Sequence, residues 1–386
     1  MTDSWIDGAA SAARMGVKPQ TLYAYVSRGR IEARPDPSDP RKSLYRVEDI
    51  DRLAARKARG RRAAVVAQDA MAWGEPILAS AITDISGGRL WFRGADATVL
   101  AKTLTLEEVA VRLWNCDDPD ALAREPKPRV RMRGTAQARA FAALAARAGM
   151  DPPALGRAPQ ALWREGASLM IDLAGALGDG VVDGPAHLIL SQAWNLDAAK
   201  ADLVRRALVL MADHELNAST FAARVAASTG ASLAAATLAG LSALSGPRHG
   251  GASAGVAALM EDAARQGAEA AVRAVIARGD QPPGFGHRFY PDGDPRAEAL
   301  LEALRPDPEL IALKQAGEQV TGRRANIDLA LAAMTHALSL PAEAPFAIFA
   351  LGRSVGWIAH ALEQLESGTL IRPRARYIGL APVTGL

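Results

Sequence analysis

The sequence predicts a mainly α-helical protein with a small module at its N-terminus. Only 5% of the 386 residues are aromatic, and small, helix-forming residues dominate the composition. From about residue 70 onward, apolar residues recur at helical spacing, as in Asp197–Glu215. Alternating strand patterns are confined to Ile77–Ile85 and Arg89–Phe92. A length of 386 residues suggests two or three domains, and 49% apolar with 23% charged residues excludes wholesale disorder.

The composition also indicates the cellular compartment of the protein. Cys116 is the single cysteine, which excludes an intrachain disulfide and a Cys-rich zinc site, and no metal site is predicted. The first basic residue, Arg14, follows two aspartates, the reverse of a secretory signal. The uncharged stretch Val225–Gly246 consists mostly of small residues, which favours a buried helix pair over a membrane span. We therefore expect a cytoplasmic protein that does not enter a membrane.

The N-terminal module differs in charge from the rest of the chain. Residues 1–62 contain 14 basic and 8 acidic side chains, although the net charge of the whole chain is only +3. Two short helices are predicted at Ile6–Met15 and Pro19–Arg28, each followed by glycine. A Pro-rich loop over residues 34–42, a strand at Leu44–Val47 and a basic helix at Glu48–Arg62 complete the module. The composition changes near residues 60–70, where we place the boundary.

This order resembles the winged helix-turn-helix of MerR-type regulators and excisionases. The resemblance implies DNA contacts from the second helix and from the wing. The alternative is a protein-docking module with a solvated basic face, because a fold does not fix a function. The residues expected to face DNA are Lys18, Gln20, Thr21, Tyr25 and Arg28 on the helix, with Arg41 and Lys42 on the wing.

Common catalytic and cofactor motifs are missing or incomplete in the body of the chain. There is no Gly-x4-Gly-Lys phosphate loop, and neither Gly-rich stretch fits a dinucleotide fingerprint. Gly251-Ala-Ser253-Ala-Gly255 matches a nucleophile elbow. That motif needs a buried strand before it, whereas this one follows a small-residue helical region, so a serine hydrolase is not favoured.

Three of the six histidines lie in polar or glycine-rich surroundings. His249 and His287 are flanked by glycines, which indicates tight turns where backbone approaches a ligand. His214 lies in a polar string between apolar segments. The other three lie in apolar helical contexts and are expected to be structural: His187, His336 and His360.

These histidine-bearing strings resemble those of citrate synthases, in the same order along the chain. The resemblance covers about residues 70–386. The matching strings are Ala-Asp-His-Glu-Leu-Asn-Ala-Ser-Thr-Phe at 212–221, Gly-Pro-Arg-His-Gly-Gly-Ala at 246–252, Gly-Phe-Gly-His-Arg at 284–288 with Asp-Pro-Arg at 294–296, Asn-Ile-Asp at 326–328, Leu-Gly-Arg-Ser-Val-Gly-Trp-Ile-Ala-His at 351–360, and the stretch at 371–379.

The resemblance implies an all-helical fold with a large and a small domain, and a Claisen-type condensation of acetyl-CoA with oxaloacetate. By resemblance, Asp328 takes the methyl proton, His249 donates to the thioester oxygen, and His287 protonates the ketone. No cofactor is implied beyond acetyl-CoA as a substrate. The expected domains are residues 1–62, a large domain at 70–251 and 346–386, and a small domain at 252–345.

Oxaloacetate has two carboxylates, which planar guanidinium groups bind better than lysines do. By resemblance, Arg296 and Arg353 bind them, His214 is a further contact, and Arg372 reaches in from the neighbouring subunit. A site shared between chains implies a homodimer.

The sequence departs from the family's pattern at Phe289 and Pro291, where an aliphatic and a basic residue are usual. The basic residue can face CoA phosphates, so we expect Arg288, Arg323 or Arg324 to replace it. Two alternatives stay open. One is a 2-methylcitrate synthase that uses propionyl-CoA, and the other is a metabolite-sensing, DNA-binding regulator with a weakly active body.

Overall fold

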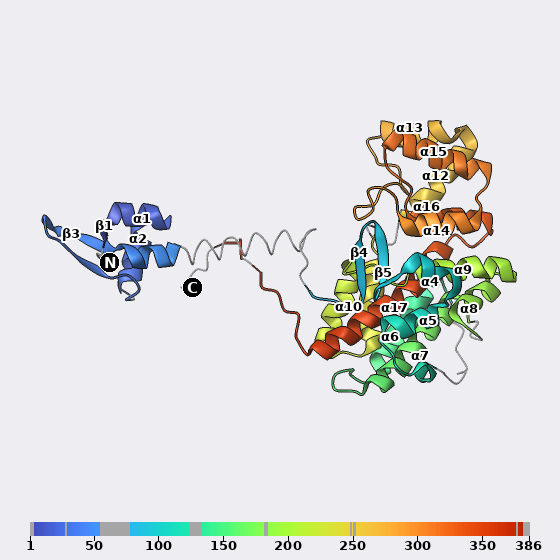
Figure 1. Cartoon of the computed structure of the whole chain (residues 1–386), viewed down its shortest axis with the longest axis horizontal. Coiled ribbons are helices and arrows are strands. Elements are labelled where there is room, and N and C mark those ends of the chain that lie inside the picture. Colours follow the sequence, from blue (N-terminus) through green and yellow to red (C-terminus); the bar gives the residue numbers. More distant parts are fainter. Residues whose placement is uncertain are drawn as a thin grey trace. The chain divides into compact units, whose positions relative to one another are not determined.

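The computed structural model describes residues 4–27, 29–54, 78–122, 133–180, 184–247, 249, 252–375 and 377–380. Its contacts divide the chain into two units, Met1–Ala79 and Ser80–Leu386 (Figure 1). Each unit has its own hydrophobic core. The two units are therefore described separately.

The first unit is a three-stranded antiparallel sheet with helices packed on it. Strands β1 (Trp5–Asp7), β3 (Asp39–Arg46) and β2 (Ala33–Asp36) lie in that order, and helices α1 (Gly8–Met15) and α2 (Pro19–Ser27) lie between β1 and β2 in the chain. Residues 47–54 are also helical. Asp7 caps α1 by accepting from the Ala10 N–H, and Gly16 ends it with φ +58°. Leu22, Tyr45 and Ile50 are central to the core.

Two sequence expectations for this unit were wrong in detail. Ile6 lies in strand β1 rather than in the first helix, because its backbone pairs with Tyr45 across the sheet. The stretch 34–42 is mostly two paired strands rather than a Pro-rich loop, with a short turn between Asp36 and Asp39. Pro35 is tolerated because β2 is an edge strand, where a missing N–H removes no central hydrogen bond.

The second unit begins with a small antiparallel sheet and continues as helices. The sheet consists of β4 (Thr83–Ser86), β5 (Arg89–Phe92) and β6 (Ala95–Asp96). The expected strand at Arg89–Phe92 is confirmed, whereas of the expected segment Ile77–Ile85 only residues 83–85 lie in a strand, residues 78–82 do not, and Ile77 lies outside the described residues. The helices that follow are α4 (Ala97–Thr103), α5 (Leu106–Leu113), η1 (Pro119–Leu122), α6 (Ala136–Met150), α7 (Pro159–Leu177), α8 (Ala186–Ala193), α9 (Ala198–Leu210), α10 (Ala218–Ser228), α11 (Leu233–Leu244), α12 (Ala252–Gln266), α13 (Ala268–Ala277), α14 (Pro295–Leu304), α15 (Pro308–Thr321), α16 (Ile327–Ala337) and α17 (Ala344–Ser367).

Helix α17 is the central element of this unit. It contacts α10, α11, α7, α9 and α5, and most of its residues are buried, including Trp357 at 0% exposure. By length and composition it is the one helix among the described residues that could cross a membrane. Because 89% of that apolar window is buried inside the protein, it is a core helix instead. The stretch Val225–Gly246, expected to be a buried helix pair, contains only the last turn of α10 and the whole of α11, and these two helices pack on each other.

A separate, smaller core lies within the second unit. It is built from α12, α13, α15 and α16, which pack together in Figure 1, and it includes Val256, Val272 and Leu313. Phe285 inserts into this core against Gly317, where an added Cβ would lie 2.0 Å from the ring. This core lies within the residues expected to form a small domain, whose exact boundaries stay a prediction.

Candidate functional site

Two arginines on different helices are almost fully buried. Arg353 on α17 is 1% exposed, and Arg296 in the first turn of α14 is 2% exposed. The chain can place Arg353 there because Gly352 and Gly356 lie directly against the end of α9 and the loop after it. A Cβ on Gly352 would lie 2.7 Å from the Leu208 oxygen, and one on Gly356 would lie 2.2 Å from Asp213 Oδ1.

Arg353 has few partners for its charge. Its Nε donates to the Met211 carbonyl at 3.0 Å, and no other acceptor for its N–H groups is found among the described residues. Burial lowers the pKa of Arg353 to about 10; Asp213 opposes this, and the Arg296 charge adds to it. A buried guanidinium without an ion pair is costly, so the site favours an incoming anion.

Arg296, by contrast, is held by its own helix cap. Asp294 accepts from Arg296 Nε at 2.9 Å and Nη2 at 2.8 Å. Burial opposes the charge of Arg296, but the Asp294 carboxylate raises the pKa of Arg296 above its usual value. Asp294 also accepts from the Ile327 N–H at 3.1 Å, which joins the start of α14 to the start of α16. The pairing with Asp294 therefore fixes the orientation of the Arg296 guanidinium.

His214 and His287 meet next to these arginines. Their ring centroids are 5.1 Å apart, and Tyr290 joins them, with its hydroxyl 3.1 Å from His214 Nε2 and its ring 4.8 Å from that of His287. Burial, then the Arg296 charge, lowers the pKa of His287 to about 4. Burial and both arginines hold the pKa of His214 well below its usual value. Both rings are therefore neutral at pH 7.

Phe289 covers this histidine pair from the solvent side. Its ring lies 6.0 Å from that of His214 and 6.1 Å from that of His287, and its side chain remains 40% exposed. The substitution noted in the sequence thus places an aromatic surface at the mouth of the site.

His249 is fixed by a hydroxyl group on α10. Its Nε2 lies 2.8 Å from Ser219 Oγ, which also accepts from Trp357 Nε1 at 3.1 Å. The ring packs edge-on against Phe349, which in turn lies 4.9 Å from the Arg353 guanidinium. Burial, then the Arg353 charge, lowers the pKa of His249 to about 4. The ring nitrogen left for a ligand is Nδ1.

Asp328 lies in the first turn of α16. Asn326 caps this helix by accepting from the Asp328 N–H at 3.0 Å. Desolvation raises the pKa of Asp328 to about 6; the Arg296 charge opposes this, and Asp294 adds to it. A half-buried carboxyl with a pKa close to neutral is well matched to taking up a proton.

A buried polar network begins at Asp213, the residue before His214, and continues away from the site. Asp213 lies 3.3 Å from His360 Nε2, and His360 Nδ1 lies 3.3 Å from Arg224, which pairs with Glu363 at 2.6 Å. His360 is fully buried, as expected for a structural histidine. Sequence reasoning missed the roles of Asp213, Ser219 and Tyr290. The signal available was their place inside, or close to, the matched histidine strings.

The structure thus brings together six expected site residues, the two buried arginines and four others, linked by ring contacts or by charges that shift their pKa values. They are His214, His249, His287, Arg296, Asp328 and Arg353. Arg372 is exposed in the segment after α17 and shows no contact with this cluster. The three arginines expected at CoA are also exposed; Arg323 pairs with Gln281, and Arg324 pairs with Glu318 at 3.2 Å, while Arg288 lies beside His287.

In the first unit, most of the expected DNA-facing residues lie on its surface. Lys18, Gln20 and Thr21 are exposed around the start of α2, while Tyr25 is half-buried against the core. Arg28 lies outside the described residues. Arg41 and Lys42 are exposed on β3, 3.8 Å and 3.5 Å from Asp39. Tyr23, which sequence reasoning did not select, is 61% exposed on the same helix.

Comparison with known proteins finds one family for this chain. A family model described as the C-terminal domain of citrate synthase matches residues 131–374. A putative citrate synthase 2 from Mycobacterium tuberculosis is 41% identical over 187 residues, 45% of this chain and 50% of that protein. A 2-methylcitrate synthase from Shewanella oneidensis is 34% identical over 186 residues, again 45% and 50%. The chain spans about half the length of the curated relatives it matches.

Solved structures match over more of the chain. Citrate synthase from Thermotoga maritima aligns with a TM-score of 0.64 and 26% identity, covering 81% of this chain and 96% of that one. A ternary complex of carboxymethyl coenzyme A and oxaloacetate with citrate synthase from Thermoplasma acidophilum aligns with a TM-score of 0.68 and 24% identity, covering 82% and 98%. The second unit therefore has the same fold as these proteins.

Proposed function

The chain belongs to the citrate synthase family, and from this premise we propose that it condenses acetyl-CoA with oxaloacetate and hydrolyses citryl-CoA to citrate and CoA. This activity makes it an acyltransferase. The main support is Arg353, a buried guanidinium without a carboxylate partner, near a second buried guanidinium at Arg296. Two such groups fit the two carboxylates of oxaloacetate.

The first step is removal of a proton from the acetyl methyl group. Asp328 takes this proton, because desolvation raises the pKa of its carboxyl to about 6 and so makes its carboxylate a stronger base than usual. The charge that develops on the thioester oxygen accepts a hydrogen bond from His249 Nδ1. Ser219 supports this assignment, because a hydroxyl that donates to Nε2 leaves the proton of the neutral ring on Nδ1.

The second step forms the carbon–carbon bond. The methylene carbon of the enol attacks the ketone carbon of oxaloacetate, and His287 gives a proton to the ketone oxygen. Burial, then the Arg296 charge, lowers the pKa of His287 to about 4. Two arriving carboxylates offset the arginine charges, so substrate raises this pKa and eases the transfer. His214 is a further oxaloacetate contact. Water then cleaves the thioester, which releases CoA and citrate.

The complete site needs a second copy of the chain. Arg372 is exposed after α17, so in a homodimer it can reach the partner's oxaloacetate site. The small domain, residues 252–345, closes over the substrates and excludes water. Arg288, Arg323 and Arg324 are the candidates for the CoA phosphates. The reaction and the single free cysteine fit a cytoplasmic enzyme.

Release of CoA thiol from purified protein tests this function directly. We expect release with acetyl-CoA that depends on oxaloacetate, with propionyl-CoA measured in parallel. Faster release with propionyl-CoA would identify a 2-methylcitrate synthase, whose acid, base and carboxylate contacts are the same. No release with either thioester, from folded protein that still binds oxaloacetate, would contradict an enzyme and favour the sensing regulator.

For the first unit we propose a winged helix-turn-helix that binds DNA. The basic charge of residues 1–62 and the exposed residues around the start of α2 support this. Full-length protein should retard duplex DNA at low salt, lose affinity steeply as salt rises, and lose it altogether without residues 1–62. Absence of any shift at low salt would instead favour a protein-docking module.

A further inference from the structure

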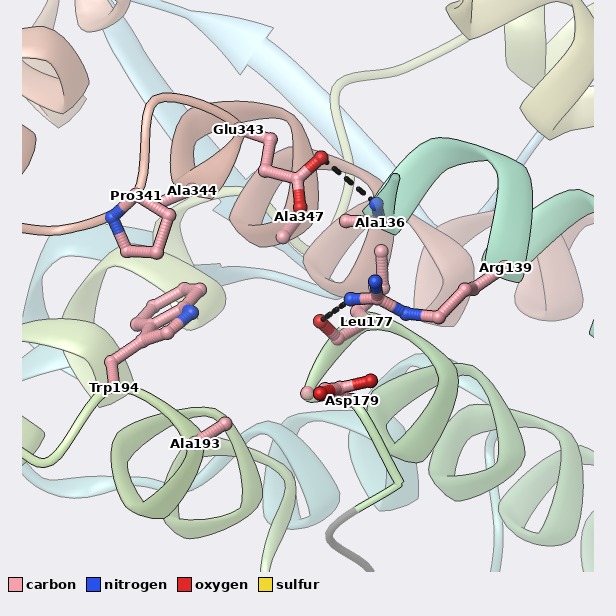
Figure 2. Close-up of a pocket in the computed structure, with 11 residues that line it drawn as sticks. Ala136, Arg139, Leu177, Asp179, Ala193, Trp194, Pro341, Glu343, Ala344 and Ala347 are labelled. Carbon is pink, nitrogen blue, oxygen red and sulfur yellow. Dashed lines mark hydrogen bonds between the residues drawn. The ribbon is translucent and has the colours of Figure 1, made fainter. Parts of the chain in front are cut away.

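The described residues also form a polar cavity, partly open to solvent, whose lining includes none of the proposed catalytic residues. Its volume is about 200 Å³, and it lies where the start of α6, the ends of α7 and α8, and the start of α17 meet (Figure 2). A space of this size is too small for a nucleotide and suits a metabolite the size of an amino acid. The lining includes charged groups of both signs, an indole ring and several alanines.

Arg139 provides a buried positive charge at this cavity. It is 8% exposed, and its donors reach three backbone carbonyls: Ala176 at 2.7 Å, Gly134 at 2.6 Å and Leu177 at 3.1 Å. A guanidinium has five N–H donors, so two, one on each terminal nitrogen, have no acceptor among the described residues. Figure 2 shows this guanidinium on one side of the space, with Trp194 on the other. It can therefore donate to a ligand carboxylate while it stays fixed.

Glu343 provides a negative charge at the same cavity. Its Oε2 accepts from the Ala136 N–H at 2.8 Å and so caps the start of α6. Its Oε1 has no partner among the residues that the structure describes, and the side chain is half-buried. Asp179 adds a second carboxylate to the lining. These carboxylates disfavour a simple anion, while Arg139 disfavours a simple cation.

Trp194 and its neighbours supply the apolar part of the lining. The indole of Trp194 is half-buried, its N–H has no acceptor in the described part of the chain, and Pro341 lies next to it in Figure 2. Ala193, Ala344 and Ala347 leave room for an apolar or small polar side chain.

From this lining we propose that the cavity binds a free α-amino acid. Its carboxylate pairs with Arg139, its ammonium group pairs with Glu343, and its side chain lies along Trp194. A zwitterion is the class that satisfies both charges at once, because a simple anion would leave the Glu343 carboxylate without an ion pair and a simple cation would leave the buried Arg139 guanidinium without one. Helix α17 begins at this cavity and also contains Arg353, so the two sites share one rigid element.

Binding to the full-length protein tests this proposal. The common amino acids are screened by thermal shift at about 10 mM, and the best ligand is measured by calorimetry in the presence of excess oxaloacetate. We expect at least one to bind, and its deaminated acid and its decarboxylated amine each to bind about tenfold or more weaker. Competition by oxaloacetate would overturn the proposal, because it would place the ligand at Arg353.

Matched variants locate the ligand. Glu343→Gln keeps an acceptor for the Ala136 N–H but removes the charge, so it should weaken binding about tenfold. Glu366→Gln changes an exposed residue near the far end of α17, the helix that follows Glu343, and should leave binding unchanged. Three results would overturn the proposal: no amino acid binds folded protein, the amine alone binds equally well, or Glu343→Gln binds as wild type does. Failure of CoA release has no bearing on these outcomes.

Discussion

Replacing Asp328 with asparagine should lower the rate of CoA release about 10³-fold while oxaloacetate binding is kept. Asparagine fills the same space but cannot accept the methyl proton, and general base catalysis typically contributes a factor of about 10²–10⁴. The rate is measured by thiol release and the binding by thermal shift with oxaloacetate. Asp292→Asn, in an exposed loop before α14, is the matched control and should behave as wild type.

The same residue sets the acid side of the pH profile. Because desolvation raises the pKa of Asp328 from 3.8 to about 6, activity should fall about tenfold per pH unit below pH 6.

The contribution of Asp328 to the free energy of unfolding should change with pH in the opposite direction to the activity. Folding favours the protonated Asp328 carboxyl, so its stabilisation is present at low pH and is lost as pH rises from 3.8 through 6. Asp328→Asn should therefore melt at a higher temperature than wild type at pH 7–8. Near-normal activity in this variant would refute the base assignment.

Replacing Arg353 with lysine should raise the KM for oxaloacetate about 100-fold. The planar guanidinium can donate two parallel hydrogen bonds to a carboxylate, whereas an ammonium group offers a single point of contact. A loss of this size corresponds to about 3 kcal/mol. Steady-state kinetics measures the KM, and the thermal shift caused by oxaloacetate should disappear. Arg273→Lys on α13, where the side chain is 65% exposed, is the control.

A second variant separates binding from folding. Arg353→Met should raise the melting temperature measured without oxaloacetate, because burial lowers the pKa of the guanidinium to about 10 and no acidic side chain lies within ion-pair distance of it in the described structure. The same variant should gain nothing from oxaloacetate. If Arg353→Met instead unfolded more easily, the guanidinium would be a structural group, and its assignment to substrate would be wrong.

Much of the site could be predicted from the sequence because its residues lie within short, recognisable sequence motifs. Glycines around His249 and His287 indicated turns, and the string at 326–328 identified Asp328 by resemblance. The structure adds that Asp328 lies in the first turn of α16, with Asn326 as the cap of that helix. Local patterns of this kind depend on neighbouring residues only, so they are readable without tertiary information.

Other features depended on residues far apart in the chain. The segment at Ile6 became a strand because Tyr45 pairs with it, and the Pro-rich stretch paired as the β2–β3 hairpin. Ser219 is next to His249 only because α10 packs against α17 and places the hydroxyl between His249 and Trp357. No spacing rule within the sequence indicates such contacts.

The sequence by itself determined a helical body, its small strands, a basic N-terminal module and the identity of the polar residues that gather in the body. Only the tertiary structure decided their chemistry. Burial beside Arg296 and Arg353 lowers the pKa values of the three histidines, and desolvation raises that of Asp328. It also decided which guanidinium is paired, since Asp294 is adjacent to Arg296 whereas Arg353 has no such neighbour. Charge and burial act through space, so they follow from packing rather than from order along the chain.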